Sequence, residues 1–207
     1  MTDCSEKIGF FEESELISYH RSYMEKEGRY KFFEMARKLL WKDYKTEGRL
    51  LLLYGWNSAW LAKRSGEFNL DRFEETLEKC KPCFDELRGE SLQKIVLEDH
   101  KKDIKDIYDT LSSVEDIKHT GASKLMCLEN PELFVMWDKG IREEVYCIKG
   151  EASGEKYFSF LEIVKEKAKN VVWIPQKCDN ITLAKAIDEL NYMKFQEMPK
   201  KAKAKSE

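Results

Sequence analysis

Apolar residues recur at helical spacing along most of this chain, and this periodicity limits the fold more than any other feature of the sequence. Between Glu13 and Tyr44 the apolar positions follow helical faces, and Gly28 divides the segment into two helices. The run from Arg49 to Lys63 is apolar nearly all round, which predicts a buried central helix. With 4 prolines and 10 glycines in 207 residues, the chain has too few turn residues for an all-β fold. We therefore expect an all-α protein.

Further helices are expected in the rest of the chain, where local signals mark their ends. These signals are an Asn69 cap for a helix that Pro82 interrupts, a start at Ser91, an amphipathic helix over Glu155–Lys169 and a Thr182 cap for the last helix. The apolar run 171–174 is stopped by Pro175 and favours an extended connector over an isolated strand. We expect one helical domain over residues 1–197, followed by a basic disordered tail over 198–207.

The charge balance gives no general support to a nucleic-acid-binding surface. The chain holds 36 basic and 39 acidic residues, a formal net charge of −3, so any such surface would have to be local. The N-terminus is acidic and lacks the apolar core of a signal peptide, and the aliphatic run Leu50–Leu53 is too short to span a bilayer. We therefore expect a cytoplasmic protein whose six cysteines are reduced.

One stretch, residues 111–142, carries most of the chemical information. A short helix is predicted to stop at a small-residue turn, Thr120-Gly121-Ala122-Ser123, and a second helix to begin at Lys124. A glycine-bearing turn before a helix lets the backbone N–H groups approach an anion closely, so this turn predicts a phosphate contact.

The lysine and a later acid add reactivity to this predicted anion site. An amine beside positive potential, or in a partly dry pocket, loses its proton more easily and becomes a nucleophile. Attack by Lys124 on a sugar C1′ would displace a base and leave a Schiff base. Asp138, as the cap of a helix over Lys139–Cys147, would stay ionised and would stabilise positive charge that develops on the sugar.

This ordered set resembles the helix-hairpin-helix superfamily of DNA glycosylases. The resemblance implies that Lys124 is the nucleophile, Gly121 the hairpin glycine and Asp138 the acid. It also implies two helical lobes, a helix-hairpin-helix element and a base flipped from double-stranded, damaged DNA into a pocket between the lobes. For that pocket we nominate Trp56, Asn57 and Trp137. The chain has no tightly spaced set of four cysteines for an iron–sulfur cluster, so no cofactor is expected.

Two other function classes stay open. The same fold serves as a non-catalytic module that binds nucleic acid or protein through the hairpin, or as a helical scaffold whose aromatic N-terminal third packs against a partner. Each nominated residue also has a structural explanation: the turn as a plain connection, Asp138 as a cap, Trp137 as core and Asn57 as a buried polar group. Cys80-x-x-Cys83 lacks a closely spaced second pair of ligands, so no metal site is predicted.

Overall fold

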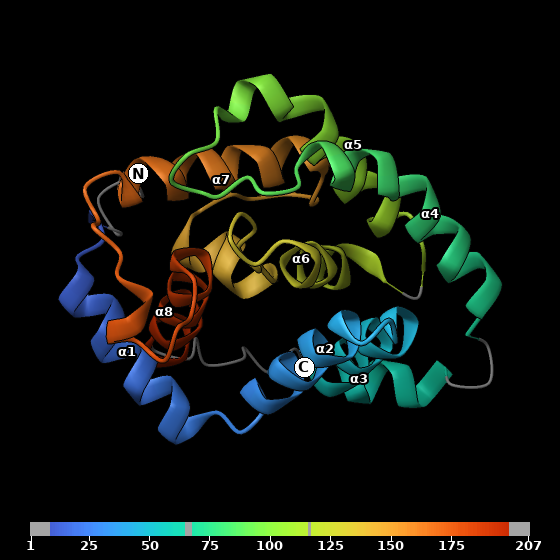
Figure 1. The fold of residues 1–207 in the computed structure, drawn as a ribbon, viewed down its shortest axis with the longest axis horizontal. Helices are drawn as coiled ribbons and strands as arrows, with labels where there is room; N and C mark the ends of the chain where they lie inside the picture. The colour runs from blue at the N-terminus through green and yellow to red at the C-terminus, as the bar shows by residue number, and fades with distance from the viewer. Residues whose placement is uncertain (1–8, 65–67, 116, 199–207) are drawn as a thin grey trace, which may run out of the picture.

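The computed structural model describes residues 9–64, 68–115 and 117–198, and side chains within these ranges except those of 56–64. The elements are α1 (Glu13–Lys26), α2 (Tyr30–Trp41), α3 (Lys45–Arg64), α4 (Leu70–Glu86), η2 (Leu97–His100), α5 (Lys101–Ser112), α6 (Lys118–Glu129), η3 (Ile141–Val145), α7 (Gly154–Ala168), η4 (Pro175–Lys177) and α8 (Leu183–Glu197). The described ranges contain no strand, so the all-α prediction is confirmed (Figure 1). The run 171–174 is an extended connector.

Helix α6 lies in the middle of the molecule. Its residues from Gly121 to Leu128 are all buried, and it packs against α5, α3 and α2. In Figure 1, α5 and α7 lie on one side of α6, α1 and α8 on a second, and α2 and α3 on a third. The prediction that Arg49–Lys63 is the central helix is wrong. Leu53 of α3 is buried, but Tyr54 beside it is 37% exposed, because α3 has only one side against the core.

The local cap signals are confirmed at two helices. The Asn69 side chain accepts a hydrogen bond from the Arg72 N–H at 2.9 Å, and Thr182 accepts one from the Lys185 N–H at 3.1 Å. Asparagine and threonine at these positions satisfy backbone donors that a helix start leaves unpaired.

Two helix boundaries differ from the prediction. Pro82 does not interrupt α4, which continues to Glu86. Packing of Cys80 in the core and of Phe84 against the Phe134 ring holds α4 on both sides of the proline, and this outweighs the lost backbone hydrogen bond. The helix predicted from Ser91 begins at Lys101, after turns and η2.

None of the described helices is long and apolar enough to cross a membrane. Cys80, Cys83, Cys127 and Cys178 are free thiols, as expected, whereas Cys147 is disulfide-bonded, so the expectation of reduced cysteines is wrong at that position. No sequence spacing signals a bond there, because such a pairing is set by the folded chain. The tail was predicted over residues 198–207, and all of it except Met198 lies outside the described residues.

Candidate functional site

The turn predicted at Thr120–Ser123 is wrong in position, because these residues lie inside α6. The break between helices comes earlier, because α5 ends at Ser112 and α6 begins at Lys118, whose N–H donates to the Val114 carbonyl at 2.9 Å. Lys118 itself takes a left-handed conformation with φ of 51°, which is uncommon for a residue with a side chain. The left-handed residue at the start of α6 is therefore Lys118 and not a glycine.

Gly121 serves the packing of helices instead of a turn. A Cβ atom at Gly121 would lie 3.0 Å from Ile117 Cγ2 and 3.3 Å from Leu53 Cδ2. The absence of a side chain lets α6 approach α3 closely at Leu53. This explains a glycine in the interior of a helix, where it otherwise costs about 1 kcal/mol relative to alanine.

Ser123 ties α6 to the segment that carries Asp138. Ser123 is fully buried, as is Ala122, so neither side chain is on the surface as the predicted turn required. The Ser123 hydroxyl donates to the Trp137 carbonyl at 2.9 Å and accepts from the Trp137 N–H at 3.2 Å. This reciprocal pair fixes the two chains in register. Lys124 follows Ser123 and Asp138 follows Trp137, so the backbone carries these two residues at adjacent positions.

Lys124 lies in the middle of α6 and is 9% exposed. Burial lowers the pKa of its amine from 10.5 to about 8; the Asp138 and Asp188 carboxylates act against this shift, and Arg29 adds to it. At pH 7 about a tenth of the amine is then unprotonated, against roughly one part in three thousand for an ordinary lysine. Burial and a neighbouring positive charge are the two conditions that favour an unprotonated, nucleophilic lysine, and Lys124 has both.

Asp138 is half-buried and caps the next helical element, as predicted. Its Oδ1 accepts a hydrogen bond from the Ile141 N–H at 2.8 Å. The element that follows is shorter than expected, because the π-helical η3 ends at Val145 and the chain leaves the helix before Cys147. π-Helical turns are rare and occur often at functional sites.

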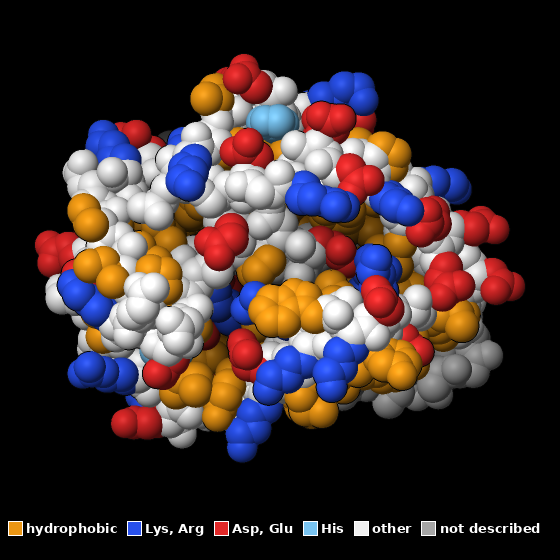
Figure 2. Space-filling view, viewed as in Figure 1, with side chains coloured by type: hydrophobic (Ala, Val, Ile, Leu, Met, Phe, Trp, Pro, Cys, Tyr) orange, Lys and Arg blue, Asp and Glu red, His pale blue; other side chains and the backbone are white. Residues whose placement is uncertain are grey.

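A second charged group borders Lys124 from the turn between α1 and α2. Arg29 donates to both Glu27 carboxylate oxygens, at 2.7 and 2.6 Å, and to the Tyr192 hydroxyl of α8 at 2.9 Å. These bonds to Arg29 lower the pKa of Glu27 to about 2. The guanidinium is therefore held in place from two elements. The face drawn in Figure 2 is hollowed near its centre, between α8 and α2 and in front of α6.

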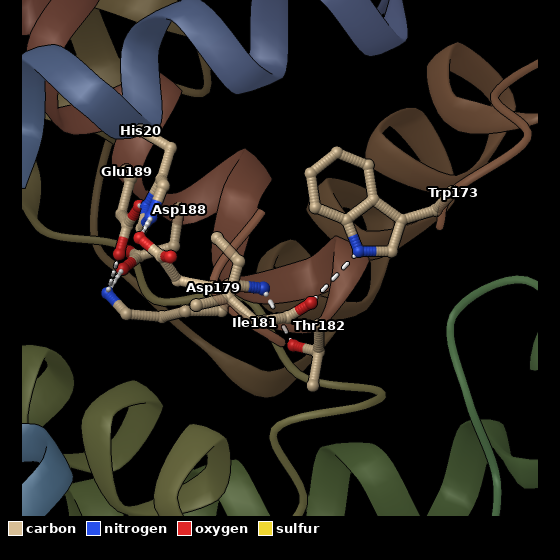
Figure 3. A network of polar contacts seen from close by, with 8 residues as sticks. His20, Trp173, Asp179, Ile181, Thr182, Asp188 and Glu189 are labelled. Carbon is tan, nitrogen blue, oxygen red and sulfur yellow. Dashed lines mark hydrogen bonds and ion pairs between the residues drawn. The ribbon is translucent and has the colours of Figure 1, made fainter. Parts of the chain in front are cut away.

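Helix α8 carries most of a buried charge network, which Figure 3 shows. The Lys185 amine lies 2.6 Å from Asp188 and 3.5 Å from Glu189, and all three side chains are less than a tenth exposed. His20 of α1 reaches the same network, 2.6 Å from Glu189 and 3.2 Å from Asp179. Asp188 is the member whose charge acts on Lys124.

Three nominated residues line a cavity of about 640 Å³ at the start of α6, namely Thr120, Trp137 and Asp138. Lys124 is not among its lining residues. Trp137 is 2% exposed, and its indole N–H donates to the buried Tyr108 hydroxyl at 3.0 Å, so most of the ring belongs to the core. The side chains of Trp56 and Asn57 lie outside the described residues.

Arg29, Asp188 and Arg142 also belong to this region, although no sequence motif includes them. Arg29 and Asp188 influence Lys124 from distant parts of the chain, and Arg142 lines the same cavity as Asp138. The predicted cap at Asp138 is the one local feature of the sequence that points towards any of these three residues, because Arg142 follows Asp138 by one helical turn. Among the residues that the structure describes, no three histidine, cysteine or acidic side chains are grouped to hold a metal ion. Comparisons with protein-family models, curated proteins and solved structures find no match to this chain.

Proposed function

We propose that the protein is a base-excision DNA glycosylase with lyase activity, in which Lys124 is the nucleophile and Asp138 stabilises charge on the sugar. One observation carries the proposal: the amine of Lys124 is buried with a pKa of about 8, it feels the charge of Asp138, and the Ser123–Trp137 bonds fix the backbone of the two residues side by side. Lysines are rarely buried to this degree unless they are paired or functional, and a perturbed pKa with a specific charge partner marks a candidate active site.

The reaction that fits these groups begins with the unprotonated Lys124 amine. Its lone pair forms a bond to C1′ of the deoxyribose while the bond between C1′ and the base breaks, and the base leaves with the bonding electrons. The amine then loses a proton, which the departing base takes up. Opening of the sugar ring transfers the C1′–O4′ electrons to O4′, which is protonated, and leaves a Schiff base between Lys124 and the sugar. The Asp138 carboxylate would lower the energy of the positive charge on the sugar.

On this proposal the helices also divide into a helix-hairpin-helix element and two lobes. The α5–α6 pair would be the helix-hairpin-helix element, with its connection displaced towards the N-terminus from the turn that we predicted. The helices α1, α2, α3 and α8 would form one lobe, and α4, α5 and α7 the other, with α6 between them. DNA with a damaged base would be the partner, and the flipped base would enter through the hollow between α8 and α2.

Borohydride trapping on DNA that contains an abasic site tests the proposal. Borohydride delivers hydride to a Schiff base and converts it to a stable secondary amine, so the wild-type chain is expected to give a covalent adduct. Lys124→Met is expected to abolish the adduct. Lys165→Met is the matched control, because burial lowers the pKa of this lysine too, but it lies on α7. No wild-type adduct, or an equal one in Lys124→Met, would reject the proposal.

Asp138→Asn tests the carboxylate separately from the fold. Asparagine caps helices as well as aspartate does, so the bond to the Ile141 N–H is retained and stability should change little. The rate of adduct formation is expected to fall about tenfold or more, since only the charge is lost. An unchanged rate would remove Asp138 from the reaction.

A second candidate function, a helical scaffold whose N-terminal third packs against a partner, is favoured by the apolar surface of α2. Met35 is 52% exposed and Trp41 is 78% exposed on this helix. Exposed apolar side chains of this size mark interaction surfaces when they gather in one patch. This candidate predicts binding of a protein partner without any trapped adduct.

A further inference from the structure

We infer that the groove between α2 and α4 binds a peptide segment of a partner protein, in which an apolar residue is flanked by side chains of both charges. The groove has a volume of about 440 Å³, and it is lined by α2, the start of α3, α4 with the residues after it, and the segment 128–132. The inference goes beyond the proposed function and does not depend on it, because neither Lys124 nor Asp138 lines this groove.

Trp41 lines the groove with most of its side chain in solvent. It is 78% exposed, the highest value among the large apolar side chains of the described residues, and Figure 2 shows hydrophobic and basic side chains next to one another over α2. The guanidinium carbon of Arg37 lies 5.3 Å from the centre of the Trp41 ring, within the range of a cation–π contact. Apolar side chains that also line the groove are those of Leu40, Phe84 and Pro131. Tryptophan and arginine often dominate the binding energy of protein interfaces, so this end of the groove suits an apolar anchor residue.

Polar contacts hold both walls of the groove on the end of α6. The Asn130 side chain donates to the Leu87 carbonyl at 3.0 Å and to the Glu90 carbonyl at 3.1 Å, which attaches the chain after α4. On the other wall, Arg49 of α3 lies 2.6 Å from the Glu129 carboxylate. The groove is therefore formed before a partner arrives, and a preformed site lowers the entropic cost of binding.

The charges that line the groove are balanced, and some of them are unpaired. Five basic and five acidic residues line it. Six of the ten form ion pairs with one another, namely Arg49 with Glu129, Arg88 with Asp85, and Lys81 with Glu78. The other four have no ion pair among the described residues: Arg37 and Lys45 from α2 and α3, and Glu90 and Glu132 from the segments that follow α4 and α6. A ligand that satisfies the groove therefore needs charges of both signs.

This charge pattern favours a peptide over a nucleic acid or an anionic membrane. Either of the latter would satisfy Arg37 and Lys45, but would also bring negative charge against Glu90 and Glu132, and like charges brought together cost binding energy. A peptide can place an acidic side chain at the first pair and a basic one at the second. Its apolar side chain, between them, would then be buried against Trp41.

Selection from a phage-displayed library of short random peptides tests the inference, with counter-selection on the Trp41→Ser variant. The enriched peptides are expected to share an aromatic or aliphatic residue flanked by acidic and basic residues. Binding of a synthetic peptide with the most enriched sequence is then measured by fluorescence anisotropy. Trp41→Ser should weaken this binding about tenfold or more. Val172→Ser is the control, because Val172 is 75% exposed and lies outside the groove, and it should leave binding unchanged. No enrichment over the variant, or enriched peptides without acidic residues, would overturn the inference.

A charge swap separates binding from folding. Arg37→Glu should weaken binding of the selected peptide about tenfold, and a peptide in which lysine replaces the acidic residue should bind Arg37→Glu better than it binds the wild type. The midpoints of thermal unfolding should stay close to that of the wild type in both Trp41→Ser and Arg37→Glu, because neither side chain belongs to the buried core. Failure of the swapped peptide to recover binding would contradict the inferred orientation of the charges and overturn the inference.

Vesicles that contain phosphatidylserine and a single-stranded oligonucleotide form two further arms. The wild type is expected to bind both no more tightly than Trp41→Ser does. Binding of either one that is lost in Trp41→Ser, with no peptide enriched, would assign the groove to a membrane or to a nucleic acid and would overturn the inference.

Discussion

Lys124 is only 9% exposed, and burying its charged amine has a free-energy cost. The lowered pKa of the amine reflects this cost. The folded pKa of about 8 lies below the ordinary 10.5, so the unfolded state binds more protons between these values. The free energy of unfolding therefore rises with pH from about 8 to 10.5, and below pH 8 the full penalty is present. A shift of this size corresponds to about 3 kcal/mol.

Lys124→Met should therefore stabilise the protein at pH 7, by on the order of 1–3 kcal/mol, because methionine fills the space without a charge. Urea unfolding at pH 7 and at pH 10 measures the effect, and the gain should shrink at the higher pH. Lys139→Met, an exposed change beside Asp138, is expected to stay within about 0.5 kcal/mol. A loss of stability in Lys124→Met at pH 7 would contradict this account of the amine.

How closely two helices pack can depend on a single residue at their contact, and Gly48 is such a residue between α2 and α3. A Cβ atom at Gly48 would lie 2.7 Å from the Ala36 carbonyl oxygen and 2.5 Å from Leu40 Cδ1. A backbone oxygen cannot move aside as a side chain can, so Gly48→Ala should destabilise the protein by about 1–3 kcal/mol. Gly28→Ala is the control, since a Cβ there meets nothing within 4 Å. Equal midpoints of thermal unfolding would refute the close packing of α2 on α3.

The pairing of α1 with α8 should depend on pH through His20. Burial lowers the pKa of His20, but its hydrogen bonds to Glu189 and Asp179 outweigh burial and raise it above 6.5. The stabilisation is therefore complete below pH 6.5 and is lost as pH rises through the folded pKa. His20→Gln should reduce the free energy of unfolding more at pH 6 than at pH 9. An equal loss at both pH values would exclude a charged His20.

Over the whole molecule, the sequence predicted those features that neighbouring residues determine. The all-α class and the caps at Asn69, Asp138 and Thr182 depend on residues within one helical turn, and all are confirmed. Gly121 was misread because its role depends on Leu53, which is distant in sequence. The burial of Lys124 follows from how α6 packs against its neighbours, and no local pattern reports that packing.

The central position of α6 connects the effects of single residues to the packing of the whole molecule. One face of the helix meets α3 at Gly121, Ser123 fixes the segment before η3, and Lys124 lies where charges from α8 and from the α1–α2 turn converge. The environment of the Lys124 amine is thus set by several elements at once, so its lowered pKa should be lost when the protein unfolds.

The most direct test of the proposed chemistry is to locate the trapped sugar on the chain. After reduction of the complex with abasic DNA, protease digestion and peptide mass spectrometry would identify the modified amine. The account predicts a single modification on Lys124, absent when the protein is unfolded before the DNA is added. Modification of the N-terminal amine or of exposed lysines such as Lys139, with Lys124 unmodified, would contradict it.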